Sequence, residues 1–161
     1  VYGLRPIELK HLTVRTDNKT KKPYLWCSYQ KRTGSGVTQP RVLYPLPVCG
    51  NSWTLLNRLK ANLLKLPPLR SDDQASDSFL TYLGRQAYWK KLKADMLKES
   101  QRLVPYSFRH AYSLRGHFLG IDSGSMADAM GHNIETHNRS YPWSSESTTK
   151  AKFERVVNHT Y

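Results

Sequence analysis

The first third of the chain alternates between apolar and polar positions in short runs, the pattern of half-buried strands. A basic, glycine-rich stretch over 31–36 is typical of a hairpin tip. Pro45 and Pro47 end the pattern, because proline cannot serve a central strand. We expect antiparallel strands over 12–15, 23–30 and 41–46, preceded by a helical turn over 4–9.

Beyond residue 50, apolar positions recur at helical spacing. Ser52 is a suitable N-cap for a leucine-rich helix that Pro67 and Pro68 would end. Further helices are expected over 79–100, with an interruption at Gly84, and over 108–119, 124–130 and 146–158. The pattern therefore predicts an α+β fold that is mainly α, a helical bundle with a small antiparallel β-sheet near the N-terminus.

The charge is strongly positive and unevenly placed. The 161 residues, enough for one domain, include 25 Lys and Arg against 12 Asp and Glu, a formal net charge of +13. Residues 1–70 alone carry 13 basic side chains and two acidic ones. A field of this kind attracts polyanions. The sequence contains no basic amphipathic helix with exposed aromatic side chains, the feature that would indicate binding to a phospholipid surface. Nucleic acid is therefore the favoured partner.

Other function classes lack their signals in the sequence. No window approaches the ~20 apolar residues that a membrane span needs. Cys27 and Cys49 are too few for a disulfide framework, and we expect free thiols in a reducing cytoplasm. The histidines have no Cys or carboxylate partner at a zinc-binding spacing. We expect no metal and no cofactor.

Three segments carry candidate chemistry: Gly3–Leu9 (GLRPIEL), Tyr106–His110 (YSFRH), and Met130–Asn133 (MGHN) with Tyr141 nine residues after the histidine. Two guanidinium groups that converge on a phosphodiester would neutralise the charge that grows during its cleavage. A tyrosine, with a usual pKa of ~10, becomes a nucleophile only where cations and a proton acceptor help it.

Together these segments resemble the catalytic domain of the tyrosine recombinases, also called phage integrases. Gly3–Leu9 is similar to their first arginine box, and Phe108-Arg109-His110 to the second. Gly131-His132 followed by Tyr141 is similar to the box of the histidine and the nucleophile. The order and the gaps fit as well, and the resemblance covers essentially the whole chain.

The resemblance implies roles for four of these residues. Arg5 and Arg109 would clamp the scissile phosphate. His132 would assist proton removal or donate a hydrogen bond to a phosphate oxygen. Tyr141 would attack phosphorus and form a 3′-phosphotyrosine link, which preserves the phosphodiester energy, so that strands can be rejoined without ATP or metal.

The resemblance also concerns the hairpin and one position of the second box. Lys31 is the best match to the hairpin lysine that protonates the departing 5′ oxygen, because the neighbouring Arg32 releases a proton less readily. We expect Arg32 and Arg41 to contact DNA. Tyr106 stands where the family commonly has histidine or lysine; it would either bind a phosphate oxygen, pack, or compete with Tyr141 as nucleophile.

The expected function is site-specific DNA recombination, integration or excision, on double-stranded DNA. The expected assembly is a homotetramer on paired sites and a monomer or weak oligomer without DNA, in the cytoplasm with the nucleoid. We expect residues 1–161 to be a catalytic domain from the C-terminal part of a longer protein, whose core-binding domain is absent from this chain. The alternatives are a topoisomerase of type IB and a DNA-binding module that has lost activity. A C-terminal helix over 147–161 would pack on its own domain or dock into a neighbouring subunit.

Overall fold

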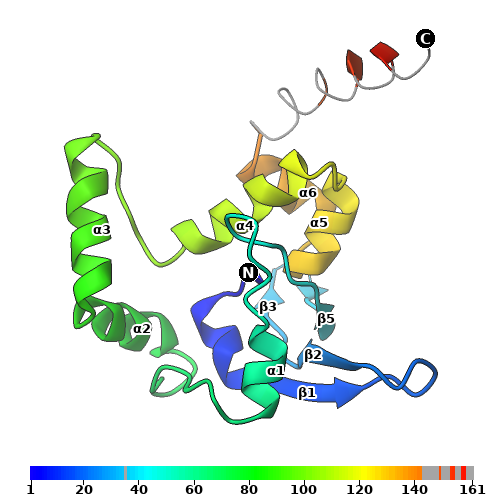
Figure 1. Cartoon of the computed structure of the whole chain (residues 1–161), viewed down its shortest axis with the longest axis horizontal. Coiled ribbons are helices and arrows are strands. Elements are labelled where there is room, and N and C mark those ends of the chain that lie inside the picture. The colour runs from blue at the N-terminus through cyan, green and yellow to red at the C-terminus, as the bar shows by residue number, and fades with distance from the viewer. Residues whose placement is uncertain (35, 143–148, 150–152, 155–156, 159–161) are drawn as a thin grey trace.

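The computed structural model describes residues 1–34, 36–142, 149, 153–154 and 157–158. Within these residues, a short 3₁₀ helix and a small sheet come first, and six α-helices follow (Figure 1). The elements are η1 (Pro6–His11), β1 (Leu12–Thr16), β2 (Pro23–Cys27), β3 (Arg32–Thr33), β4 (Gly36–Val37), β5 (Arg41–Leu43), α1 (Leu55–Lys60), α2 (Ala75–Gly84), α3 (Ala87–Lys98), α4 (Ser107–Phe118), α5 (Ser123–Met130) and α6 (Ile134–Ser140). The predicted α+β fold, mainly helical with a small antiparallel sheet, is confirmed.

The main sheet has the order β1-β2-β5, and both pairings are antiparallel. The central strand, β2, turns Leu25 and Cys27 to a buried face, where they pack with Tyr2 and Leu43. The leucines of α1 cover this cluster. Burial of the alternate residues on one face explains why the predicted period of two held in this part of the chain.

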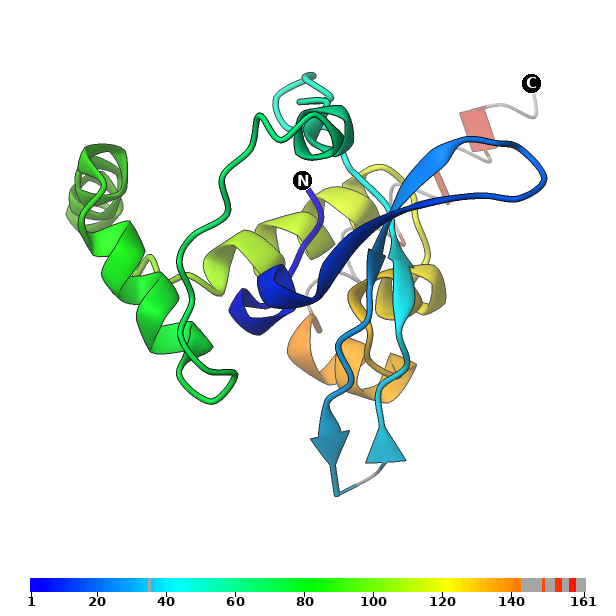
Figure 2. The ribbon, with the colours of Figure 1, turned by 90° about the horizontal axis from the view of Figure 1, so that it is seen from below.

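A second hairpin, β3–β4, extends beyond the main sheet (Figure 2). Arg32 pairs with Val37 in a two-stranded ladder of its own. The segment predicted as a hairpin tip therefore contains two short strands. Figure 2 shows that the β1–β2 connection projects from the sheet in a different direction.

Among the described residues, the helices α2 to α6 form two groups and not one bundle. In Figure 1, α2 and α3 stand at one side, and α4, α5 and α6 lie together near the middle. Tyr112 of α4, Met126 and Met130 of α5, and Tyr141 after α6 share a buried core with Leu46. The two groups meet where the ring of Trp89 on α3 lies 5.6 Å from that of Phe108 on α4.

Several helix boundaries differ from the prediction. The leucine-rich helix ends at Lys60, well before the two prolines. The helix expected over 79–100 begins earlier, at Ala75, and is divided after Gly84. The helix α6 was not predicted. The helix expected over 146–158 falls largely outside the described residues. Within the described part of the chain, no helix has the length and apolar character needed to cross a bilayer.

Candidate active site

Helix α4 turns one continuous stripe of side chains into the protein. Its buried residues follow the spacing i, i+3, i+4, i+7, i+8 of a single helix face. They are Arg109, Tyr112, Ser113, Gly116 and His117. Arg109 belongs to this stripe, and none of its surface is exposed. The helix thus carries a permanent positive charge into the interior, where it needs partners.

Arg109 ties together the three segments that the sequence singled out. Its Nη1 donates a hydrogen bond to the carbonyl oxygen of Gly3 at 2.6 Å, and its Nη2 donates to the carbonyl of Met130. Gly3 has a left-handed φ of 60°, and a Cβ there would overlap the ring of Tyr112. The first segment can therefore approach α4 only because residue 3 is glycine.

A buried carboxylate, Glu8, organises the arginines. It accepts hydrogen bonds from the Arg5 backbone N–H at 2.8 Å and from Arg5 Nη1 at 2.6 Å, which also caps η1. Arg41 Nη2 donates to it at 3.0 Å, and Arg109 Nη1 lies 3.9 Å away. We call Arg5, Glu8, Arg41 and Arg109 the arginine cluster. Three cations around one anion leave a net charge of +2, which favours a bound anion.

The ionised state of Glu8 follows from this arrangement. Burial alone raises the pKa of a carboxyl group. The hydrogen bond from Arg41 and the charges of the three arginines outweigh burial and hold the pKa of Glu8 below its usual range. Glu8 is therefore a carboxylate at neutral pH and serves as the counter-ion of the cluster.

Arg5 also contacts the third segment, Met130–Asn133. Its Nη2 donates to the carbonyl oxygen of Gly131 at 2.9 Å. Gly131 ends α5 with a left-handed φ of 67°, the usual geometry of a C-terminal glycine. The Arg5 side chain is 13% exposed. Because a guanidinium has five N–H donors and Arg5 uses one on each Nη here, donors remain for a phosphate.

Arg41, predicted to contact DNA, lies in the interior. Its Nε donates to the carbonyl oxygen of Ala129 at 2.9 Å, and its Nη2 is bound to Glu8. A Cβ on Gly131 would stand 2.5 Å from Arg41 Nη1. These contacts suit a residue that holds β5 against α5. The predicted contact between Arg41 and DNA stays a prediction.

His132 and Tyr141 are brought together by α6. Asn133 caps this helix by accepting a hydrogen bond from the Thr136 N–H at 2.8 Å. The helix ends one residue before Tyr141, whose backbone N–H donates to the carbonyl of His137. The ring centroids of His132 and Tyr141 are 6.3 Å apart. A short helix thus turns a separation of nine residues into a contact of two rings.

The Tyr141 side chain is buried, with 1% of its surface exposed. Its ring lies 4.8 Å from that of His137 and 5.3 Å from that of His110, between centroids. Burial raises the pKa of the Tyr141 hydroxyl, and the nearby Arg109 opposes that rise. Tyr141 is therefore a neutral phenol at pH 7, with a guanidinium beside it to stabilise negative charge.

His132 is also neutral. Burial, followed by the charges of Arg109, His137, Arg5 and Arg41, lowers its pKa to about 3. A neutral imidazole has one donor and one acceptor nitrogen. It can therefore donate to a phosphate oxygen or accept a proton. A bound phosphodiester would offset the arginine charges and raise this pKa again.

Tyr106 lies at the rim of this site. It occupies the N-cap position of α4, and 41% of its surface is exposed. Its ring meets that of His110 edge-on at 5.0 Å, and His110 in turn contacts Tyr141. The structure thus places Tyr106 one ring away from Tyr141, on the solvent side.

The hairpin residues lie outside the arginine cluster. Lys31 and Arg32 are exposed, and the Lys31 backbone N–H donates to Thr38 Oγ1 at 2.8 Å. Among the contacts described, none joins either side chain to the arginine cluster, His132 or Tyr141. A cavity of about 410 Å³ is lined by residues 36–41, by Asp128 and by residues 131–133, which include His132. The hairpin faces the site across this cavity.

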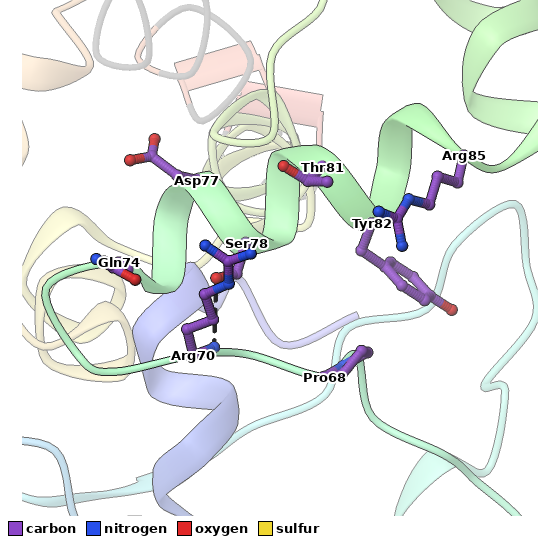
Figure 3. Close-up of a pocket in the computed structure, with 8 residues that line it drawn as sticks. All are labelled: Pro68, Arg70, Gln74, Asp77, Ser78, Thr81, Tyr82 and Arg85. Atoms are coloured by element: carbon purple, nitrogen blue, oxygen red, sulfur yellow. Dashed lines mark hydrogen bonds between the residues drawn. The ribbon is translucent and has the colours of Figure 1, made fainter.

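A second groove lies away from this chemistry. It has a volume of about 310 Å³ and is formed by α2 and the segment before it (Figure 3). Arg70 and Arg85 point toward it, and the Arg70 backbone N–H donates to Ser78 Oγ at 3.3 Å. None of the predicted site residues lines this groove. We therefore place the candidate active site at the arginine cluster.

Three residues of the site were missed by sequence reasoning. Glu8 lies one helical turn after Arg5, and this spacing was the available signal. His117 and His137 received no role, because nothing in the sequence places α4 beside α6. Within the described parts of the chain, no three His, Cys, Asp or Glu side chains are arranged to hold a metal ion.

Two curated proteins from Nostoc sp. (strain PCC 7120 / SAG 25.82 / UTEX 2576) are similar to parts of the chain. Excisase A is 31% identical over 71 residues, which are 43% of this chain and 14% of that protein. Excisase C is 34% identical over 55 residues, which are 34% of this chain and 11% of that protein. The matches thus span only a small part of either relative's length. No protein-family profile and no solved structure matches the chain.

Proposed function

We propose that this chain catalyses DNA strand cleavage and rejoining in site-specific recombination, of the excision type that its relatives' names indicate. The likeness to Excisase A and Excisase C supports a recombination role. The observation that carries the chemical proposal is the meeting of Arg5, Arg109, His132 and Tyr141 around one site. They come from three segments that are distant in sequence.

The positive cluster suits a phosphodiester in the process of cleavage. Negative charge grows on the phosphate oxygens as phosphorus becomes five-coordinate. Preorganised donors stabilise such charge more than water does, because they need no reorganisation. Arg5 and Arg109 are already fixed by Glu8 and by backbone carbonyls. We propose that they bind the scissile phosphate through N–H groups that these bonds leave over.

The proposed nucleophile is Tyr141. In the step, a bond forms between its oxygen and phosphorus, and the bond from phosphorus to the 5′ oxygen breaks. The phenolic proton leaves toward His132, and Arg109 stabilises the developing phenolate. The product is a 3′-phosphotyrosine and a free 5′ hydroxyl. Rejoining reverses the same steps with the 5′ hydroxyl of another strand.

The leaving 5′ oxygen needs a proton, and we assign Lys31 to this task. Lys31 is exposed at the start of the hairpin, whose residues Gly36 and Val37 line the same cavity as His132. The lysines of the β1–β2 connection and the base of the hairpin offer further contacts to the DNA backbone. These exposed residues are Lys19, Lys21, Lys22 and Arg32. Arg41, from the interior, would act through the positions of Glu8 and α5.

A suicide substrate tests this function. Nicked duplexes from sheared genomic DNA, labelled on the 3′-side phosphate, are incubated with the wild type, Tyr141→Phe and Tyr106→Phe at low salt. A protease-sensitive labelled adduct is expected with the wild type and Tyr106→Phe and not with Tyr141→Phe. An adduct that survives Tyr141→Phe would move the nucleophile to Tyr106 or elsewhere. Salt-dependent binding with no adduct on any duplex would instead indicate a DNA-binding module.

A topoisomerase would give the same adduct, so a second assay is needed to separate the two. Recombination requires two sites, whereas relaxation of a supercoiled plasmid requires one. Products that join two differently labelled duplexes support the proposal. Relaxation with no joined product contradicts it in favour of the type IB activity.

A further inference from the structure

Three histidines form a continuous hydrogen-bonded chain beside the proposed nucleophile. His132 Nε2 lies 2.9 Å from His137 Nδ1, and His137 Nε2 lies 2.9 Å from His117 Nε2. We call these residues the histidine chain. His137 and His117 are buried, with 0% and 4% of their surfaces exposed. The histidine chain connects the loop after α5 with α6 and α4, and the ring of His137, its middle residue, packs on Tyr141.

This geometry restricts where the protons can be. A neutral imidazole carries one N–H, and each of the two contacts needs one donor and one acceptor. If His132 Nε2 carries a proton, His137 must accept at Nδ1 and donate from Nε2, and His117 must accept at Nε2. If His132 Nε2 is bare, every bond is reversed. His132 and His137 therefore share one tautomer, and His117 has the opposite one.

The two arrangements give His132 two different chemistries. In both of them His132 Nε2 is occupied by His137, so Nδ1 is the atom left for substrate or Tyr141. With the proton on Nε2, Nδ1 is a bare acceptor that can take the phenolic proton. With Nε2 bare, Nδ1 carries the proton and can donate to a phosphate oxygen. These are the two roles that the sequence left open for His132.

We infer that His137 and His117 are positioning residues that fix the tautomer of His132 and let its proton be shared along the histidine chain. The assignment of a chemical role to His132 rests on the proposed function, whereas the tautomer relation does not. A proton that enters at Nδ1 releases one from Nε2 to His137 Nδ1, and His137 releases one from Nε2 to His117 Nε2. The number of protons is conserved at each step.

The surrounding charges favour this direction. On His132, burial acts most strongly, followed by the charges of Arg109, His137, Arg5 and Arg41. On His137, burial, His117 and Arg109 act. The other groups that face His137 are His132 and Tyr141. A proton that moves from His132 to His137 is therefore acted on less by Arg5 and Arg41. Sharing the charge makes proton acceptance beside the arginine cluster less costly.

Nitrogen-15 NMR of the whole chain without DNA tests the tautomer relation. Imidazole nitrogens have distinct shifts when protonated and when bare, so each ring reports its tautomer. We expect at pH 7 that His132 and His137 share one tautomer and that His117 has the other, all three neutral. Opposite tautomers in His132 and His137, or a charged ring among the three, would overturn the inference. The NMR measurement does not depend on catalytic activity.

A matched pair of variants separates positioning from packing. Both His137 and His110 place a ring against Tyr141, but only His137 belongs to the histidine chain. In His137→Phe, which keeps the ring, we expect His132 to lose its single tautomer. In His110→Phe we expect the tautomer of His132 to stay as in the wild type. If His137→Phe leaves His132 unchanged, the inference fails; if it does not fold, His117→Gln is measured by the same criterion.

The covalent trap adds a functional readout. We expect adduct formation by His137→Phe to fall by roughly tenfold or more, in keeping with the loss of an assisting acid–base group. The surface variant His11→Gln serves as the control. A wild type with the expected tautomers but no adduct would overturn the proposed function and leave the tautomer relation intact. An unchanged rate in His137→Phe would overturn the positioning role alone.

Discussion

The two regions that carry the proposed chemistry are held in opposite ways. The arginine cluster is fixed by buried hydrogen bonds that cross the whole chain, such as that between Arg109 and Gly3. The hairpin with Lys31 is exposed, and its own two-stranded ladder holds it. The residues of the proposed phosphate site are therefore held by contacts within the protein, whereas Lys31, the proposed proton donor, lies on an exposed hairpin. The two regions should therefore respond differently to substitution.

The largest effect is expected from loss of the counter-ion. Glu8→Ala leaves Arg5, Arg41 and Arg109 as mutually repelling, partly buried cations. Removing one partner from a buried ionic group costs about 3–5 kcal/mol. We expect the free energy of unfolding, measured with urea, to fall by that amount. The control Asp95→Ala breaks the exposed ion pair with Lys98 and should change stability little. Equal effects of the two variants would contradict a buried cluster.

The next largest effect on stability is expected when a glycine beside the arginine cluster is replaced, in comparison with a glycine of the hairpin. Gly3→Ala adds a Cβ at a left-handed φ and against the ring of Tyr112. Backbone strain and overpacking together should lower the free energy of unfolding by about 2–4 kcal/mol. Gly34 in the hairpin has open space around the position of a Cβ. Gly34→Ala should therefore be near neutral in the same denaturation assay, and a loss like that of Gly3→Ala would contradict the comparison.

Lowering the pH is expected to reduce the free energy of unfolding by a smaller amount. Burial and neighbouring positive charges lower the pKa of His132 to about 3 and that of His137 to about 4. Unfolded histidines bind protons near pH 6.5. Between pH 6 and 4.5 the unfolded state therefore holds more protons, and the free energy of unfolding falls as pH falls. The expected slope is roughly 1 kcal/mol per pH unit for each histidine.

Urea titrations at several pH values within this window measure the slope. Glu8, whose pKa is lowered, makes the fold lose stability only below its unfolded pKa of about 4.5, so the window reports the histidines. His137→Phe should flatten the dependence. A wild type whose stability is constant between pH 6 and 4.5 would contradict the buried, neutral histidine chain.

The smallest effect on stability is expected at the hairpin. Lys31→Ala should leave the free energy of unfolding within about 0.5 kcal/mol, as surface substitutions usually do. Its effect should appear in strand cleavage, because the 5′ oxygen would leave without a proton. A substrate with a 5′-thio leaving group needs no such proton and should restore cleavage. No rescue would assign the proton to Arg32 or to another group.

Much of the fold follows from local patterns. The alternation in β2 and the proline and glycine signals placed the sheet, and the stop at Gly84 was expected. The helix α6 escaped prediction because Ile134–Ser140 is short and mostly polar, without apolar periodicity. Its existence depends on the Asn133 cap and on burial of His137 against α4. The contact between His137 and α4 is tertiary, and the local sequence pattern does not predict it.

In the candidate site, too, some features could be predicted from the sequence and others depend on tertiary contacts. Arginines, histidine and tyrosine could be selected from sequence, because their chemistry and order suggested a phosphate-transfer site. The position of Arg41 could not, since its partners Glu8 and Ala129 lie 33 and 88 residues away. The fold gives Arg41 two buried acceptors, the carbonyl oxygen of Ala129 and the carboxylate of Glu8.

The central claim is that Tyr141 becomes covalently joined to DNA within the arginine cluster. The most direct measurement is mass spectrometry of the trapped adduct after digestion with protease and nuclease. The account predicts a residual nucleotide on the peptide that contains Tyr141, attached through its 3′ phosphate. A nucleotide on Tyr106 or on any other side chain, or attachment through a 5′ phosphate, would contradict it.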